Sequence, residues 1–215
     1  MIIQGQTGPQ QSSDGNQVTP RMGRLGELVT TELHGKYYEQ CARGNVYIGS
    51  TLIAGLALPI YSATAQLFMI WNPLGSLKNV SIIKVAIARV SGTGSADHLM
   101  WGGCLVAGAD AAANNPITAY TKAYPINALI GAGMNSVVKF ANTTATALAA
   151  PTIVAELGIS NSVYDGTGAT VPPFPLIVNY NGDMVIGQGA ALFLCNDTAA
   201  TTVWGASVTW EEVPV

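Results

Sequence analysis

From Asn45 onward, short apolar runs are separated by clusters of Gly, Pro, Asn and Ser. This pattern is typical of β-strands joined by turns, and no strand–helix alternation interrupts it. We therefore predict a mainly β protein whose strands occupy residues 46–53, 65–71, 80–90, 99–106, 136–140, 152–157, 176–178, 184–186, 191–195 and 203–211.

Two of these segments show which face of a strand is buried. In 80–90 the apolar positions are Val80 and Ile82, then Val85 and Ile87, and in 203–211 large apolar residues alternate with Gly, Ser, Thr and Glu. A two-residue period indicates one buried face and one outward face. Many such strands with long connections predict an antiparallel β-sandwich, and we expect a jelly roll, because that topology wraps two sheets together.

The N-terminal part of the chain has a different pattern. Residues 1–20 lack periodicity and are rich in Gln, Ser, Gly, Asn and Pro, which predicts an extended arm. Segment 21–45 is rich in charge, and its apolar residues recur at helical spacing before Gly44. Gly35 and the β-branched run 29–31 oppose a helix, so a single helix and an arm crossing a sheet remain alternatives. The β-sandwich domain is then expected over 46–215.

Two later segments lack a strand pattern. Residues 107–133 are rich in Ala and Asn, and we expect a long connection between sheets or a loop that reaches a neighbouring subunit. Residues 161–175 contain several Gly and Pro residues, which predicts a second loop.

Charge is scarce in a chain this hydrophobic. Only 10% of the residues are charged while 49% are hydrophobic, and an ordinary soluble domain has about 25% charged residues. No Lys or Arg follows Lys139. Because a free monomer needs charged surface to remain soluble, we expect this chain to cover much of its surface with copies of itself, in a homo-oligomer, or with other subunits.

The same composition argues against several classes of function. The nine Lys and Arg residues are scattered, and nucleic-acid binding requires a clustered cationic patch. No apolar run has the length of a membrane helix, and no segment has the form of a secretory signal. We therefore expect neither a nucleic-acid partner nor a membrane partner.

Candidate chemical groups are few and isolated. The two histidines are His34 and His98, and we interpret Asp97–His98 as a solvated loop pair. Glu211 and Glu212 are adjacent, so on a strand they face opposite sides, and we interpret them as a charged edge that discourages strand pairing. We expect no catalytic residue, no metal site and no cofactor, and hence no enzyme.

The cysteines and tryptophans have structural interpretations. Cys41, Cys104 and Cys195 are odd in number and lack CxxC spacing, so we expect buried free thiols, as suits a reducing cytoplasm. The four tryptophans are expected to pack in the core or at subunit interfaces. The alternative is that Trp and Tyr side chains bind carbohydrate on a host surface, as in a tail or head-fibre protein.

Some segments resemble structural proteins of tailed bacteriophages. Segment 70–76 (IWNPLGS) followed by 78–85 (KNVSIIKV) resembles a Gly-Ser hairpin of that group. Segment 187–194 followed by 203–213 is similar to the closing strand pair of the same proteins. Segment 32–40 followed by 43–45 also resembles this group. Leu77 stands where a second Gly is more familiar in the hairpin.

The resemblance implies a virion protein with a jelly-roll-like sandwich and no catalytic motif. Within that group it implies a capsid decoration, or cement, protein that is made in the host cytoplasm. Such a protein is expected to form a homotrimer on the capsid surface and to bind the major capsid protein. The major capsid subunit itself is less expected, because the β-rich pattern lacks the long helix of that fold.

Overall fold

A computed structural model describes residues 35–92, 97–104, 116–133, 135–160, 175–198 and 202–215. The chain divides into two compact units, 1–39 and 40–215, and the second contains all the strands of the described residues. The expected arm of 1–20 and most of the 21–45 segment lie outside the described residues. One helix, α1, covers Tyr38–Ala42, so the described end of that segment contains a short helix.

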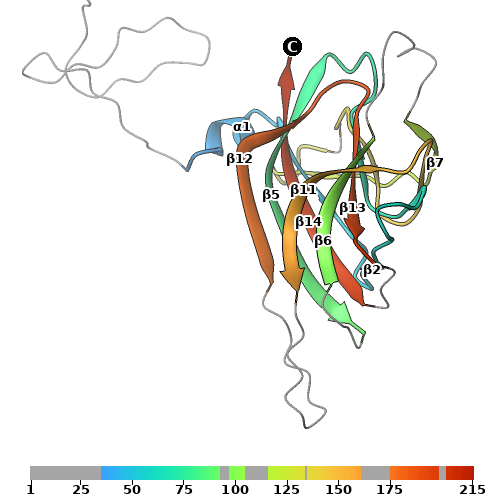
Figure 1. Ribbon diagram of the computed structural model, residues 1–215. Coiled ribbons are helices and arrows are strands. Elements are labelled where there is room, and N and C mark those ends of the chain that lie inside the picture. The colour runs from blue at the N-terminus through green and yellow to red at the C-terminus, as the bar shows by residue number, and fades with distance from the viewer. Residues whose placement is uncertain (1–34, 93–96, 105–115, 134, 161–174, 199–201) are drawn as a thin grey trace, which may run out of the picture. The chain divides into compact units, whose positions relative to one another are not determined.

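Eight strands form a jelly roll, which confirms the mainly β sandwich expected from the sequence (Figure 1). One sheet has the order β1-β14-β5-β12 and the other has the order β4-β13-β6-β11, with antiparallel pairing throughout. Their bounds are β1 Val46–Ser50, β4 Met69–Trp71, β5 Lys78–Ser91, β6 Asp97–Cys104, β11 Thr152–Ser160, β12 Leu176–Ile186, β13 Ala191–Asn196 and β14 Val203–Pro214.

Short strands extend this framework. Two lengthen the first sheet, to six strands: β2 (Leu56–Ala57) pairs with β14, and β8 (Ile126–Asn127) pairs with β1. A third, β9 (Lys139–Ala141), pairs with β4 and lengthens the second sheet to five. A separate three-stranded sheet has the order β3-β10-β7, formed by Ala65–Gln66, Ala145–Ala147 and Ile117–Tyr120.

Segment 107–133 was expected to be a long connection between sheets or a loop, and its described part contains two short strands that belong to different sheets. Residues 116–133 contain β7 and β8, while 105–115 lie outside the described residues. Strands of two to four residues carry too few alternating positions to show a period, so the sequence pattern does not reveal them.

Two apolar layers hold the three sheets together. The larger one lies between the six-stranded and five-stranded sheets and contains Trp101 and Trp210, both fully buried. The smaller one lies between the five-stranded and three-stranded sheets and contains Phe193 and Cys195. Strand β13 contributes to both layers and is buried along its whole length. This explains why its sequence is a continuous apolar run rather than an alternating one.

The alternation in β5 and β14 is confirmed. Every second residue of β14 from Trp204 to Glu212 is buried. In β5 the alternation of buried and outward positions changes phase after Ile82. The register with β14 shifts at the same place: Ile82 pairs with Trp210, whereas Lys84 pairs with Thr209. Ile83 is therefore the extra residue of a β-bulge, which restores inward facing at Val85.

Neither strand pair of the phage resemblance is a hairpin. Strands β4 and β5 lie in different sheets, and so do β13 and β14. The IWNPLGS segment is thus a corner between the sheets, closed by Asn72, whose side-chain amide donates to the carbonyls of Lys78 (2.9 Å) and Ile186 (3.1 Å). Gly75 and Leu77 adopt positive φ angles of 77° and 56° in this corner. Successive strands of a jelly roll commonly change sheets, which a local turn motif does not reveal.

Candidate functional site

His98 does not lie in a solvated loop. It belongs to β6, where its Nε2 atom pairs with the Glu156 carboxylate and its Nδ1 atom lies 3.8 Å from an oxygen of Asp197. His34 lies outside the described residues. Among the described residues, no group of three or more His, Cys, Asp or Glu side chains is placed to hold a metal ion. His98 therefore links the strand to its neighbours as part of an exposed polar cluster.

The interpretation of Glu211 and Glu212 as a charged edge is wrong. Both lie on β14, a central strand between β5 and β1. The two side chains do face opposite sides: Glu212 is fully buried, whereas Glu211 is partly exposed and its burial raises the pKa of its carboxyl. The edge interpretation failed because strand order cannot be read from two adjacent residues.

Glu212 is the centre of a buried polar network. One carboxylate oxygen lies 3.1 Å from Lys78 Nζ. The other accepts hydrogen bonds from the Ser136 hydroxyl (2.5 Å) and from the Val137 backbone N–H (3.1 Å). A buried charge is tolerated when it is paired and hydrogen-bonded in this way. The network fastens residues 136–137 and the start of β5 to β14, so its role is structural.

The tryptophans are mainly core residues, as expected. Trp101 and Trp210 have no exposed surface and Trp204 has 3%. Trp71 is half-buried, with its ring edge-on to Tyr120 at 6.0 Å between centroids. A sugar-binding platform needs exposed aromatic faces, and three of the four tryptophans do not provide one. Among the aromatic residues considered for carbohydrate binding, Tyr38 and Tyr124 are exposed whereas Trp101, Trp204 and Trp210 are buried.

The three thiols differ in burial, and all are unpaired. Burial raises the pKa of Cys104 to about 11 and that of Cys195 to about 12. Cys41 is half-buried, and burial followed by the nearby Glu211 charge raises its pKa. Since the thiolate is the reactive form, a raised pKa and low exposure both slow modification.

We therefore expect Cys41 to be the first thiol modified in the native protein. A disulfide reagent such as dithionitrobenzoate at pH 8 should label Cys41, and Cys104 and Cys195 should react only after urea unfolding. The measurement is the number of thiols titrated with and without urea. The Cys41→Ser variant is the control, and rapid labelling of that variant while it is folded would contradict the prediction.

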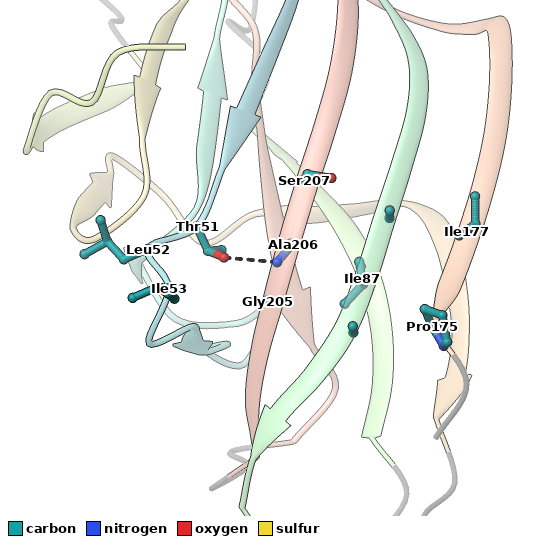
Figure 2. Close-up of a pocket in the computed structure, with 11 residues that line it drawn as sticks. Thr51, Leu52, Ile53, Ile87, Pro175, Ile177, Gly205, Ala206 and Ser207 are labelled. Atoms are coloured by element: carbon teal, nitrogen blue, oxygen red, sulfur yellow. Dashed lines mark hydrogen bonds between the residues drawn. The ribbon is translucent and has the colours of Figure 1, made fainter. Parts of the chain in front are cut away.

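The candidate functional surface is a shallow groove of about 390 Å³ on the outer face of the six-stranded sheet (Figure 2). Its floor consists of small residues on two adjacent strands, Ala86 and Ala88 on β5 and Gly205 and Ser207 on β14. These occupy the outward positions of the alternating pattern, opposite the core. None of the described residues that line the groove carries a charge.

The groove walls are larger apolar residues. Leu52 and Ile53 stand on one side of β14, and Pro175 and Ile177 stand on the other (Figure 2). Ile53 is 100% exposed and Ile177 is 56% exposed. A contiguous set of exposed apolar side chains marks an interaction site more often than scattered ones do.

Local hydrogen bonds hold the Leu52–Ile53 wall in place. Thr51 continues the pairing of β1 with β14, since its N–H donates to the Ala206 carbonyl (2.9 Å) and its hydroxyl accepts from the Ala206 N–H (3.1 Å; Figure 2). A turn follows, in which the Gly55 N–H donates to the Leu52 carbonyl. Gly55 has a φ of 72°, and a Cβ there would lie 2.9 Å from the Trp204 carbonyl oxygen, so only glycine fits.

Sequence reasoning did not identify this groove. The small residues at the outward positions of the two longest strands were a usable signal, because charged or long polar side chains normally occupy such positions. The walls come from the β1–β2 connection and from the start of β12, and nothing in the sequence places those segments beside the floor.

No helix within the described part of the chain is long and apolar enough to cross a membrane. The comparisons with protein-family models, curated proteins and solved structures give no match for this chain.

Proposed function

We propose that this chain is a non-enzymatic structural protein of a bacteriophage virion, and specifically a decoration protein that binds and stabilises the capsid. The observation that carries the proposal is the uncharged groove with its exposed Ile53 and Ile177 walls on the outer sheet face. An exposed apolar surface of this kind requires a partner in a protein with so few charges.

The fold and the sequence resemblance support the same proposal. Jelly rolls are recurrent in viral capsid proteins, although they also occur in lectins and cupins, so the fold alone does not decide the function. The resemblance of 70–85 and of the C-terminal strands to phage structural proteins favours the viral option. Three cysteines without a disulfide suit a protein synthesised in the host cytoplasm before it joins the virion.

The proposed partners are other copies of this chain, in a homotrimer, and the major capsid protein. Each interface gains about 25 cal/mol per Å² of apolar surface buried, before the cost of ordering is subtracted. A closed trimer covers the same patch on every subunit. Many weak contacts over a capsid lattice then add up to stable attachment.

The native mass of the purified protein, measured by light scattering with and without emptied capsids, tests the proposal. The capsids are assembled from the major capsid protein of the same genome. A stable trimer that co-sediments with capsids is the expected result. A soluble monomer that does not bind capsids would overturn the proposal.

Deletion of residues 1–20 is expected to leave a folded protein that no longer binds capsids. The physical reason is that a polar arm without a core contributes little to folding and is free to contact neighbouring subunits. Circular dichroism of the truncated protein checks the fold, and co-sedimentation checks binding. Capsid binding equal to that of the full chain would contradict the proposed role of the arm.

A further inference from the structure

The proposed function leaves open what occupies the outer-face groove. We propose that the groove receives residues 21–34 of a neighbouring copy of the chain, so that subunits are joined by exchange of their N-terminal segments. This inference rests on the proposed self-assembly and specifies the contact that produces it.

The first step is where the chain enters the 40–215 unit. Asn45 accepts a hydrogen bond from the Glu212 N–H (2.9 Å), and its own N–H donates to the Gln40 carbonyl (3.0 Å). The chain therefore enters this unit beside Glu211 and Glu212, at the opposite end of β14 from Gly205. Glu211 occupies an outward position of β14, as Gly205 does in the groove floor.

The second step is reach. Gly205 in the groove floor and Glu211 near the chain entry lie on the same strand, about 20 Å apart along it. The fourteen residues of the segment span at most about 50 Å when extended. The preceding segment can therefore reach a groove on an adjacent subunit that packs near this face.

The third step is chemical match. The segment contains Leu25, Leu28, Val29 and Leu33, which suit an uncharged apolar groove. The small side chains of the floor allow an incoming chain to approach the sheet closely, and the walls supply apolar contact on both sides.

Segment 21–34 carries Arg21 and Arg24 as well as two glutamates, and one of its carboxylates can meet a cation beside the groove. Lys84 is exposed at an outward position of β5, in register with Thr209 of β14. The segment carries Glu27 and Glu32, either of which can pair with this ammonium group. Such an ion pair helps to set the register in which the segment docks, and it contributes less to the binding affinity.

Photo-crosslinking of the full-length protein tests the proposal. A photoreactive phenylalanine analogue replaces Ile177 in the groove wall, and the product is mixed with nitrogen-15-labelled copies that lack the probe. The expected result is crosslinks between probe and labelled residues 21–34, identified by mass spectrometry. The matched control carries the probe at Ile153, which is 42% exposed on β11 of the other sheet, and should give no such crosslinks.

A charge placed in the groove provides a second readout. Ala88→Glu should lower the crosslink yield about tenfold or more, since docking would bury an unpaired carboxylate. Ala88 is exposed, so the variant should unfold at the same urea concentration as the parent. Ile53→Asp, at a fully exposed position, repeats the test if Ala88→Glu does not fold.

The outcomes separate this inference from the proposed function. Crosslinks confined to the probe's own chain, crosslinks to other segments, or none at all in a sample that still forms trimers and binds capsids would overturn segment exchange alone. A monomer that ignores capsids would overturn the proposed function and the exchange with it.

Discussion

Replacement of Lys78 by Met should lower the free energy of unfolding by about 3–5 kcal/mol, which is the usual cost of leaving a buried charge unpaired. Lys78 is 26% exposed, whereas its partner Glu212 is fully buried. Removing the ammonium group therefore leaves a carboxylate that water cannot reach, with hydrogen bonds from Ser136 and Val137 as its remaining contacts. Urea unfolding at pH 7, followed by tryptophan fluorescence, measures the effect.

Three further variants make this test specific. Lys84→Met removes an exposed cation from the same strand and should change stability by less than about 0.5 kcal/mol. Glu212→Gln should cost less than Lys78→Met, because the remaining Lys78 is partly hydrated. The double variant Lys78→Met, Glu212→Met should recover part of the loss, since no unpaired charge remains. Equal unfolding midpoints for Lys78→Met and Lys84→Met would show that the ion pair does not stabilise the fold.

Replacement of Trp210 by Ala should lower the free energy of unfolding by about 3–5 kcal/mol, through lost burial and a cavity. The Trp210 ring packs between Tyr47 (6.4 Å between centroids) and Phe140 (6.0 Å). Gly49 lies against the same rings: a Cβ there would be 2.7 Å from Phe140. The aromatic cluster fills the space that a glycine provides, so the site has little room to collapse around a cavity.

Thermal or urea denaturation followed by circular dichroism measures this change without relying on the deleted fluorophore. The control is Tyr124→Ala, because Tyr124 is 60% exposed and should contribute less than about 0.5 kcal/mol. An unfolding midpoint for Trp210→Ala equal to that of Tyr124→Ala would contradict the placement of Trp210 at the centre of the sandwich.

The periodicity of the sequence was sufficient to predict β5 and β14 and their buried faces. The two strands expected over 176–178 and 184–186 are instead one strand, β12. The alternation of apolar and small or polar residues in β14 is visible in the sequence. The apolar pattern of β5 changes phase between Ile82 and Val85, where the structure has a β-bulge. The apolar run of β13 also predicted a buried strand. Strand periodicity depends on residues that are neighbours in the sequence, so it can be read from the sequence alone.

Features that depend on distant residues could not be predicted in this way. The burial of Glu212 depends on Lys78 and on Ser136, which are remote in the sequence. The local sequence around Asn72 has the pattern of a hairpin. The two flanking strands nevertheless join different sheets, and only the topology of the whole chain determines this. The groove likewise requires the β1–β2 connection, β5, the start of β12 and β14 to meet.

The position of β14 determines when the jelly roll can be completed during synthesis. This strand lies between β1 and β5 and pairs with both. The first strand of the jelly roll, β1, therefore pairs with the last strand, β14. During synthesis, the edges of β1 and β5 that pair with β14 lack their hydrogen-bond partners until β14 leaves the ribosome. Sheets built from such distant segments fold slowly. The outer-face groove, whose floor is half β14, does not exist on an unfinished chain. If subunits associate through that face as proposed, only chains whose jelly roll has been completely synthesised can do so.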